Sequence, residues 1–398
     1  MSTLQKTTLT SEHILTRGVE QVLPDANSLA KRMAQRPVRL YLGIDPTGNQ
    51  LHLGHAVVLR KLQQFAELGH EVILLIGNGT VKIGDPTGKD KTRPMITDAE
   101  IEANFQTWKE QASAILDFDK ITIRRNGDWY DMMSFAELIQ LFSNMTVQQL
   151  MERDMFQERL KSGAPIHAHE ILYPILQGFD SVEMDVDLEI GGTDQLFNMM
   201  VGRQMQQSMK NREKWVLAVP LLLGSDGRKM GKSLGNYIAL TEAPREMYGK
   251  LMSVSDDVIL QYFQSLTDLT NEEIAEMESR IAAGENPMEF KKLLAFTITQ
   301  DLHSHADASD AQAFFERTVQ KGEVPKNIPD LELTEDVKTL LDLVMLTGVP
   351  ASRSEARRLI EQGGVSVDGM KLTEQLLATA KIPTGVLKVG KRNYFTIS

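Results

Sequence analysis

The segment Tyr41-Leu-Gly-Ile-Asp-Pro-Thr-Gly-Asn-Gln-Leu-His-Leu-Gly-His55 decides the fold of this chain. It begins in an apolar run, residues 38–44, that is typical of a buried strand, and it leads into a run with helical spacing, residues 55–68, that ends at Gly69. Further strand-like runs follow at residues 72–76, 121–124, 186–190 and 216–223. Strands that alternate with helices predict an α/β fold with a Rossmann-like parallel sheet and helices on both of its faces.

The composition excludes several classes of protein. The chain has 398 residues, of which 42% are hydrophobic and 24% are charged, as in ordinary globular proteins. It has no cysteine, which excludes a disulfide framework, a thiol nucleophile and cysteine-ligated zinc. The longest apolar stretch, residues 215–223, is too short to span a bilayer, and the first residues lack the pattern of a secretory signal. We therefore expect a cytoplasmic protein that does not bind membranes.

Charge is distributed unevenly along the chain. The net charge is −11, but residues 349–398 carry eight basic and four acidic residues, so this segment is +4 and the remainder is −15. A basic module on an acidic body is typical of a protein that reaches a polyanion with one domain. The alternative is a solvated, charge-rich C-terminal domain.

Changes in pattern predict the domain organisation. Residues 1–240 carry the alternating pattern, interrupted at 129–163 by a Met-rich helical insertion. This insertion is either a packing surface for a second subunit or an ordinary buried helical pair. Residues 241–320 have a wholly helical pattern, 321–337 form a turn-rich linker, and 338–398 form a small α+β domain.

His52, Gly54 and His55 lie where the first strand joins its helix. Ligands of open α/β sheets bind at such junctions, beside a helix N-terminus that favours anions. Two imidazoles can donate hydrogen bonds to phosphoryl oxygens, and Gly54 leaves room for a flat base. The alternatives are a zinc pair or core histidines bonded to backbone.

A second motif, Asp226-Gly-Arg-Lys-Met-Gly-Lys-Ser233, follows the last apolar strand. Its polar, Gly-containing sequence predicts an exposed loop, in which Lys229 and Lys232 could neutralise a nucleoside triphosphate. A solvated lysine-rich loop is the alternative, but the position after a strand of the same sheet favours a shared site with His52 and His55.

These two motifs together, HLGH at 52–55 and KMGKS at 229–233, resemble the HIGH and KMSKS motifs of class I aminoacyl-tRNA synthetases. The remaining residues resemble the bacterial tyrosyl-tRNA synthetases over nearly the whole chain. The resemblance implies a homodimer, with the 129–163 insertion as its interface, that attaches tyrosine to its tRNA using ATP. Mg²⁺ is expected with ATP, and no metal bound by protein side chains is expected. Gly231 is a departure, because the family often has Ser there.

The amino-acid pocket is predicted from residues 171–180. Tyr173, Gln177 and Asp180 lie at offsets of zero, four and seven, on one face of a helix, which suggests a polar ligand or satisfied buried polar groups. The resemblance implies that Tyr173, Gln177 and Asp85 hold the ammonium group of tyrosine. It also implies that Tyr41 and Asp180 bond the phenolic hydroxyl and that Gln195 binds tyrosine.

The remaining site predictions concern ATP. The stretch 78–93 is Gly-rich but is not a P-loop, and the resemblance implies that Lys89 and Arg93 close on the pyrophosphate; a solvated basic turn is the alternative. Gly191 and Asp194 suit a ribose. Glu189 stands where many family members have Gln. The ATP-binding residues that we predict are Gly43, Asp45, Thr47, His52, Gly54, His55, Gly191, Asp194, Lys229, Met230, Lys232 and Ser233.

The C-terminal module carries a basic helix followed by Gly363-Gly364, a short strand and an Asp368-Gly369 turn. It resembles the small RNA-binding fold first known from ribosomal small-subunit protein four. Arg353, Arg357 and Arg358 would then contact RNA phosphates without reading sequence.

Alternative functions follow from the same motifs. A related synthetase for tryptophan shares the fold, and a synthetase-like RNA-binding protein without catalysis would belong to another class. Two other histidine pairs, His167 with His169 and His303 with His305, have metal-like spacing but no further ligands nearby in the sequence, so we interpret them as surface or core residues.

Overall fold

The computed structural model describes residues 9–86, 96–321, 324, 328–333, 337–350, 352–372, 384–390 and 393–397. The chain divides into two compact units. The first comprises the residues up to Ala243 together with Lys250–Ser304, and the second comprises Pro244–Gly249 and the residues from His305 onward. None of the described helices is long and apolar enough to cross a membrane. The predicted domain boundaries stay predictions, and these units place the helical segment 241–320 partly in each.

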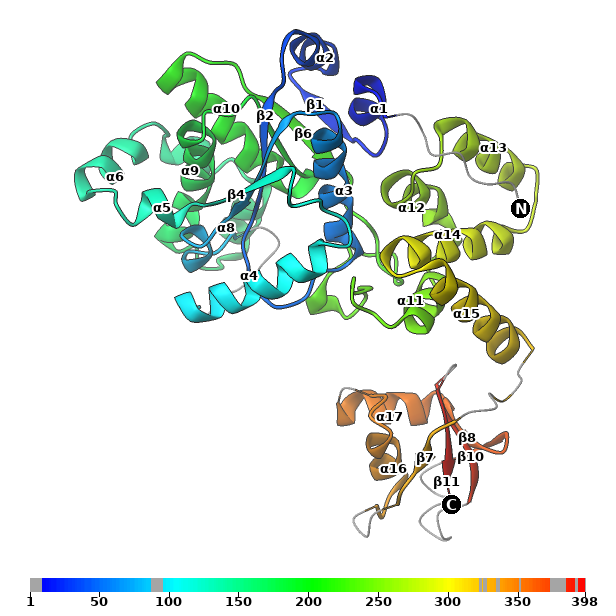
Figure 1. Ribbon diagram of the computed structural model, residues 1–398. Helices are drawn as coiled ribbons and strands as arrows, with labels where there is room; N and C mark the ends of the chain where they lie inside the picture. The colour runs from blue at the N-terminus through cyan, green and yellow to red at the C-terminus, as the bar shows by residue number, and fades with distance from the viewer. Residues whose placement is uncertain are drawn as a thin grey trace. The chain divides into compact units, whose positions relative to one another are not determined.

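A six-stranded sheet with the order β1-β6-β5-β2-β3-β4 forms the centre of the first unit (Figure 1). Neighbouring strands from β6 to β4 are parallel, as predicted, whereas β1 pairs antiparallel with β6 at the edge. The three-residue β1 was not predicted, because so short a run carries no periodic signal. The strands are β1 (Gln21–Leu23), β2 (Arg39–Ile44), β3 (Glu71–Ile76), β4 (Ile121–Arg125), β5 (Leu188–Gly192) and β6 (Trp215–Val219).

Two strand boundaries differ from the prediction. The strand predicted at 216–223 ends at Val219, because Pro220 has no N–H to donate to a neighbouring strand. The strand predicted at 186–190 spans Leu188–Gly192 instead, and Val186 packs in a core with Tyr41 and Ile73. The α/β fold class itself is confirmed.

Helices connect the strands, and α1 to α4 each begin at a residue whose side chain caps the first turn. The helix predicted at 55–68 is α3, Leu53–Glu67, with His52 as its N-cap, and the chain leaves it through Gly69 at φ +80°. The helix predicted to carry the pocket is α9. The connecting helices include α1 (Ser11–Thr16), α2 (Ala26–Gln35), α4 (Asp98–Ala112), α9 (Ala168–Glu183) and α10 (Leu196–Lys210).

The 129–163 insertion is partly buried and partly exposed, and its role in contacting a second subunit stays a prediction. Leu141 and Leu150 are buried in a core with Ile175 and Leu176 of α9. Other apolar side chains are exposed, including Phe135 at 79% and Ile139 at 53%, and α6 lies at the margin of the unit (Figure 1). The segment forms α5 (Gly127–Tyr130), α6 (Phe135–Phe142), α7 (Val147–Leu150) and α8 (Asp154–Ser162).

The segment predicted as helical, 241–320, consists of helices joined by short connections and contains no strand. Thr270 and Asn286 cap two of its helices through side-chain bonds to backbone N–H groups. The helices are α11 (Pro244–Leu251), α12 (Ile259–Leu266), α13 (Asn271–Ala282), α14 (Pro287–Leu302) and α15 (His305–Phe315), with a final turn at Glu316–Gln320.

The C-terminal residues form the predicted α+β domain. Its sheet has the order β7-β11-β10-β8-β9, and its core includes Leu343, Ala356 and Leu387. Asp368 and Gly369 both have positive φ, so they form the predicted tight turn between β8 and β9. The elements are β7 (Asp330–Leu331), α16 (Leu340–Leu346), α17 (Arg353–Glu361), β8 (Val365–Val367), β9 (Met370–Lys371), β10 (Gly385–Val389) and β11 (Asn393–Ile397).

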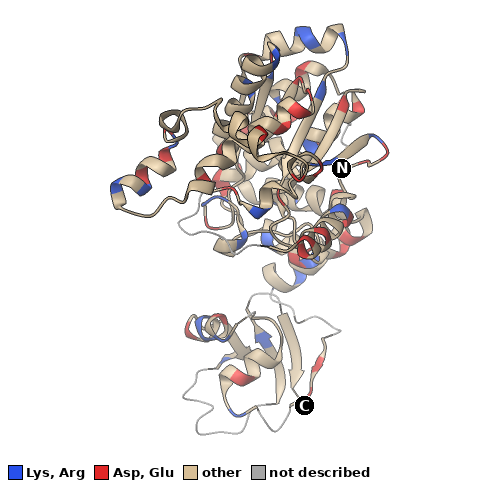
Figure 2. Cartoon of the chain, turned by 90° about the vertical axis from the view of Figure 1, so that its left-hand side faces the viewer, with Lys and Arg blue, Asp and Glu red and all other residues tan. Residues whose placement is uncertain are grey.

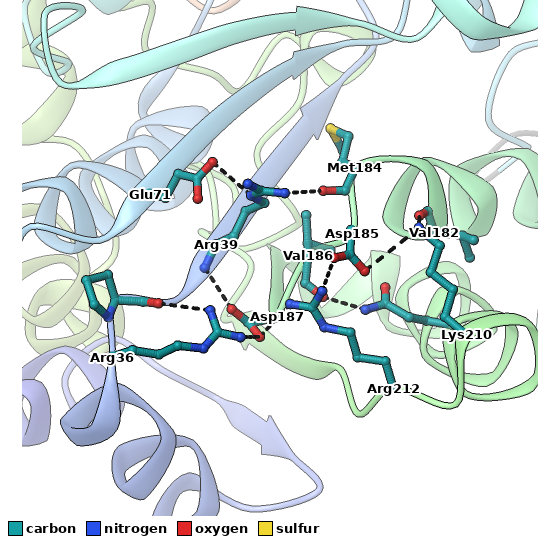
Figure 3. Close-up of polar contacts among 12 residues, drawn as sticks. Arg36, Arg39, Glu71, Val182, Met184, Asp185, Val186, Asp187, Lys210 and Arg212 are labelled. Carbon is teal, nitrogen blue, oxygen red and sulfur yellow. Dashed lines mark hydrogen bonds and ion pairs between the residues drawn. The ribbon is translucent and has the colours of Figure 1, made fainter.

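The amino-terminal edge of the large sheet is held by Asp187, which immediately precedes β5 (Figure 3). Its side chain is 3% exposed and accepts hydrogen bonds from the guanidinium groups of Arg32, Arg36 and Arg212 and from the backbone N–H of Arg39. Nearby, Arg39 also pairs with Glu71, which is half exposed. One buried carboxylate therefore joins α2, β2, β5 and the end of α10.

We expect Asp187→Ala to lower the free energy of unfolding by about 3–5 kcal/mol, because it removes the buried acceptor of the largely buried Arg32 guanidinium and of the Arg39 backbone N–H. Glu71→Ala is the matched control and should cost less than about 1 kcal/mol, because that ion pair is solvated. Denaturant unfolding of both variants tests this. Equal losses in the two variants would contradict the role assigned to Asp187.

Candidate active site

The carboxyl ends of the parallel strands gather the predicted site residues at one edge of the sheet. On one side of β2 the sheet continues with β3 and then β4. On the other side it continues with β5 and then β6, so the direction in which the strands are added reverses between β2 and β5. Ligands of open α/β sheets bind outside such a switch point. Tyr41 of β2 lies directly opposite Glu189 of β5, and Asp45 and Asp194 follow the ends of these two strands.

The two histidines cap α3 and bond to backbone. The N–H of Gly54 donates to Nδ1 of His52 over 3.2 Å, and the N–H of His52 donates to Nδ1 of His55 over 3.1 Å. A neutral imidazole that accepts at Nδ1 carries its proton on Nε2. Gly54 is needed here, because a Cβ at this position would lie 3.0 Å from the His52 ring. Both histidines are thus set to donate from Nε2.

Burial keeps these imidazoles neutral. It lowers the pKa of His52 to about 4, and the positive charges of Lys232 and Lys229 add to this effect. Burial also lowers the pKa of His55 well below its usual value, with further contributions from His52 and Lys232. At neutral pH the positive charge at this edge of the sheet therefore resides on lysines, and the histidines act as uncharged donors.

The second motif forms a folded turn next to this pair. Lys229 donates to Oδ2 of Asp194 over 2.6 Å, and Lys232 lies 5.9 Å from the ring centroid of Trp108. Met230 is buried and its N–H donates to Leu222 O, which anchors the loop to the chain after β6. Ser233 lies in the short turn Lys232–Leu234. Both lysines and both histidines are therefore brought to the same edge.

Asn236 organises this loop and was missed by the sequence analysis. Its Oδ1 accepts from the N–H of Gly231, and its Nδ2 donates to Asp226 Oδ1 and to Lys229 O. Its position after the motif was the only signal for it. Gly231 itself is extended, and a Cβ there would meet nothing within 4 Å, so the Ser that the family often has would fit without strain.

Asp180 and Tyr41 are both buried, but they have different partners. Asp180 accepts hydrogen bonds from Trp129 Nε1 over 3.1 Å, from Tyr130 OH over 2.7 Å and from Asn126 Nδ2 over 3.1 Å. The hydroxyl of Tyr41 lies 2.9 Å from Ser181 Oγ. Burial raises the pKa of Asp180 to about 8, against the opposing effect of its three donors. Burial likewise raises the pKa of Tyr41 well above its usual value.

Tyr173 is connected to Asp180 through a chain of polar groups. It donates to Asp45 Oδ2 over 2.9 Å, and Thr80 donates to Asp45 Oδ1 over 2.8 Å. Asn126 donates to Thr80 Oγ1 over 2.9 Å and also reaches Asp180. We predicted Asp45 as an ATP ligand, and in the structure its carboxylate accepts hydrogen bonds from Tyr173 and Thr80. The sequence analysis missed Thr80 and Asn126, which follow two different strands, β3 and β4, and share no motif.

A second chain links the remaining pocket residues. Gln195 donates to Asp85 Oδ2 over 2.7 Å, and Asn198 donates to both Gln195 Oε1 and Gln177 Oε1. Gln177 in turn donates to Glu189 Oε1 over 3.1 Å. The structure thus brings Asp85, Gln177 and Gln195 together through Asn198, which is fully buried and was not predicted.

The other predicted residues can be placed briefly. Gly43 lies in β2 beside the ring of Tyr41, Thr47 follows Asp45 in the turn after this strand, and Gly191 packs against Met199. Lys89 and Arg93 lie outside the described residues. Among the residues that the structure describes, no three His, Asp or Glu side chains are grouped as metal ligands would be. Within these described residues, therefore, neither of the two other histidine pairs has a third such side chain placed to complete a metal site.

The three arginines predicted to contact RNA lie on α17, whose charged residues are coloured in Figure 2. Ser352 caps this helix by accepting from the N–H of Glu355, while Ala356 and Ile360 are buried. Arg357 and Arg358 are exposed, and Arg353 pairs with Asp342 while its side chain stays 66% exposed. These three cations are accessible to a polyanion.

Two family models match this chain and together cover most of it. A family model described as tRNA synthetases class I (W and Y) matches residues 33–320, and one described as the tyrosine–tRNA ligase SYY-like C-terminal domain matches residues 320–397. The tyrosine–tRNA ligase of Thermotoga maritima is 44% identical over 387 residues, which are 97% of this chain and 96% of that protein. Tyrosine–tRNA ligase 2 of Vibrio cholerae is 44% identical over 383 residues, 96% of each chain.

Solved structures show the same fold at lower identity. The C-terminally truncated mitochondrial tyrosyl-tRNA synthetase of Coccidioides posadasii has a TM-score of 0.61 at 23% identity, covering 76% of this chain and 90% of that one. The tyrosyl-tRNA synthetase of Archaeoglobus fulgidus, solved with L-tyrosine, has a TM-score of 0.60 at 21% identity, covering 76% and 98%. The tryptophanyl-tRNA synthetase of Plasmodium falciparum shares the fold with a TM-score of 0.55 at 15% identity, covering 72% and 80%.

The C-terminal family model and the relatives above 40% identity decide between the tryptophan and tyrosine alternatives. Both point to tyrosine, and the relatives match over nearly the whole chain. The chain belongs to the tyrosine–tRNA ligases, a family of class I aminoacyl-tRNA synthetases.

Proposed function

We propose that this tyrosine–tRNA ligase works in two steps at the carboxyl edge of its large sheet. In the first step the carboxylate of L-tyrosine attacks the α-phosphorus of ATP, which releases pyrophosphate and leaves tyrosyl adenylate on the enzyme. In the second step a hydroxyl of the terminal tRNA ribose attacks the adenylate carbonyl, which forms the ester of tyrosyl-tRNA and breaks the bond to the phosphate, so that AMP and the hydroxyl proton leave. The observation that carries this proposal is the placement of His52, His55, Lys229 and Lys232 beside the polar chains that include Tyr173 and Gln177.

The chemistry requires charge stabilisation and positioning rather than a covalent nucleophile. The Nε2–H groups of His52 and His55 would donate to the phosphate oxygens, and Lys229 and Lys232 would neutralise the charge that develops on the departing pyrophosphate. Lys229 now pairs with Asp194, so binding of ATP would have to exchange that carboxylate for phosphate. Lys89 and Arg93 are proposed for the same role. Mg²⁺ would enter with ATP, because it prefers phosphate oxygens and water to a protein cage.

The remaining ATP ligands are proposed from their position at the same edge. Gly43, Gly54 and Gly191 would let the nucleotide approach the backbone closely. Asp194 would accept from the ribose hydroxyls. Asp45, Thr47, Met230 and Ser233 would complete the site, and Asp45 would at the same time orient Tyr173 through their 2.9 Å hydrogen bond.

Tyrosine would bind between the two polar chains. Tyr173, Gln177 and Asp85 would hold its ammonium group with Gln195 close by, and Tyr41 and Asp180 would bond its phenolic hydroxyl. Tyr41 has no exposed surface, so a substrate can reach its hydroxyl only by displacing a side chain that now covers it. The hydroxyl of tyrosine would donate to Asp180 and accept from Tyr41.

We also propose a cytoplasmic homodimer that binds its tRNA through the C-terminal domain. Arg353, Arg357 and Arg358 would contact phosphates, since all three are accessible on α17. The 129–163 insertion is the proposed dimer interface, because it exposes Met132, Phe135, Ile139, Val147 and Leu160. A hollow of about 500 Å³ beside α7 and α10, partly lined by Met145, Phe197 and Met200, could receive a partner's side chain.

The proposal is tested first by tyrosine-dependent exchange of labelled pyrophosphate into ATP without tRNA. In this assay Asp180→Ala should raise the KM for tyrosine about 10- to 100-fold and leave the KM for ATP nearly unchanged, because the buried hydroxyl of tyrosine is left without an acceptor. Asp128→Ala removes an exposed carboxylate from the neighbouring segment and is the matched control. Small, equal effects on both KM values would remove Asp180 from the pocket.

The low pKa of His52 predicts a pH effect on stability. Its pKa is about 4 in the folded protein and near 6.5 in the unfolded chain, so the unfolded state binds the extra proton between these values. The contribution of neutral His52 to the free energy of unfolding is therefore fully present above pH 6.5, and it is lost as the pH falls toward 4. Asn at position 52 keeps a capping side chain but does not titrate. Between pH 7 and pH 5 the unfolding free energy of His52→Asn should therefore fall by about 2 kcal/mol less than that of the wild type.

Denaturant unfolding at the two pH values measures this change. His169→Asn is the control, since His169 is exposed. If wild type and His52→Asn lose the same free energy between pH 7 and pH 5, the neutral state assigned to His52 is wrong.

The proposed dimer interface is tested by substituting charged residues on α6. Phe135→Glu with Ile139→Glu places two carboxylates on its exposed apolar side and should convert the protein to monomers, because burying them at an interface is unfavourable. Light scattering gives the mass. Met288→Glu, at an exposed position of α14 outside the insertion, should leave the mass unchanged. A dimer that survives both substitutions would place the interface elsewhere.

A further inference from the structure

Lys214 and Glu189 form an ion pair inside the first unit, beside the proposed tyrosine pocket. The side chains are 0% and 2% exposed. Lys214 immediately precedes β6, and Glu189 lies in β5 between Tyr41 of β2 and Val216 of β6. Replacing a buried ion pair by apolar residues of similar size is often neutral or stabilising, so such a pair is weak evidence for a purely structural role.

The ammonium group of Lys214 has a partner for each of its three protons. It donates to Ser181 Oγ over 2.6 Å, to Met199 O over 3.2 Å and to Glu189 Oε2. Gly202 of α10 provides the room, because a Cβ there would lie 2.6 Å from Nζ. The position of Lys214 is therefore fixed by backbone, by a carboxylate and by the lack of a side chain on the facing helix.

Ser181 connects this cation to Tyr41. A lysine can only donate, so Ser181 Oγ must be the acceptor in their hydrogen bond. The proton of Ser181 has two possible acceptors: the hydroxyl oxygen of Tyr41 at 2.9 Å and Glu189 Oε2 at 3.3 Å. Glu189 Oε2 already accepts from Lys214, and the contact to Tyr41 is shorter. The geometry favours a chain of donors that runs from Lys214 to Ser181 to Tyr41.

We infer that Lys214 and Ser181 are positioning residues that orient the hydroxyl of Tyr41 as a donor toward the phenolic oxygen of tyrosine. Glu189 compensates the buried charge and also accepts from Gln177. Each hydrogen bond in such a chain polarises the next, so the cation strengthens the O–H of Tyr41 as a donor. This inference rests on the proposed contact between Tyr41 and the substrate, and it assigns tyrosine specificity to residues that do not touch tyrosine.

The test compares tyrosine with phenylalanine, which lacks the hydroxyl and is unaffected by the orientation of Tyr41. We would measure kcat/KM for both amino acids by pyrophosphate exchange at high enzyme concentration. Ser181→Ala breaks the chain and should lower the ratio of the tyrosine to the phenylalanine value about three- to tenfold, mainly through the KM for tyrosine. The KM for ATP and the phenylalanine value should not change.

A double variant tests Lys214, the first donor of the hydrogen-bond chain, without leaving a buried charge unpaired. Lys214→Met with Glu189→Gln removes both charges and keeps an amide that can accept from Gln177, and the tyrosine to phenylalanine ratio should fall at least as far as in Ser181→Ala. Arg159→Met with Glu170→Gln is the matched control. That pair is 8% and 7% exposed and involves the same helix, α9, but it should leave the ratio unchanged.

The outcomes separate this inference from the proposal on which it rests. If Tyr41→Phe leaves the ratio unchanged, the proposed contact between Tyr41 and tyrosine is wrong. If Tyr41→Phe lowers the ratio but Ser181→Ala does not, the inference is overturned, because the proton of Tyr41 then points to Ser181 in the native enzyme and is released by the substitution. Should the double variant fail to fold, Ser181→Ala still decides the matter.

Discussion

The parallel pairing of β2 with β5 is the constraint on which the rest of the site depends. It sets Tyr41 beside Glu189 at the point where the order of the sheet reverses, and it places the turns after both strands at one edge. The side chains there are polar and mostly buried, and a buried polar group without a partner costs about 1–3 kcal/mol. The requirement to pair each group explains why Tyr173, Asp45, Thr80 and Asn126 form a continuous chain.

The two edges of the sheet differ in role: the amino-terminal edge carries contacts that stabilise the fold, and the carboxyl edge carries the proposed site. Asp187 joins arginines from several elements at the amino-terminal edge, where the partners are all protein groups and no rearrangement is required. At the carboxyl edge Lys229 and Asp194 satisfy each other across an exposed contact, and the side chain of Lys229 is 52% exposed. An exposed ion pair contributes little to stability, so it can be exchanged for a ligand at small cost.

The sequence was sufficient for the parts that depend on local spacing. Residues 38–69 carried enough signal for β2, the turn and α3, and the offsets of Tyr173, Gln177 and Asp180 placed them on one helix. What could not be predicted depends on contacts between distant segments. Asn198, Asn126 and Ser181 belong to no motif, and each acquires its role only when strands far apart in sequence become neighbours. The exact end of β6 is different, since Pro220 was visible and its missing N–H sufficed to stop the strand.

The histidine motif shows how one local device can serve folding and catalysis together. An N-cap must present an acceptor to the free N–H groups of the first turn, and Nδ1 of His52 does so here, while Nδ1 of His55 accepts from the backbone N–H of His52 in return. That bond fixes the tautomer, and the tautomer directs the remaining proton outward from Nε2. A charged imidazole would have no acceptor at Nδ1 and would lose the cap, so the helix start itself favours the neutral form. The cap therefore preorganises two donors at the N-terminus of α3, where the helix dipole favours the same phosphate oxygens.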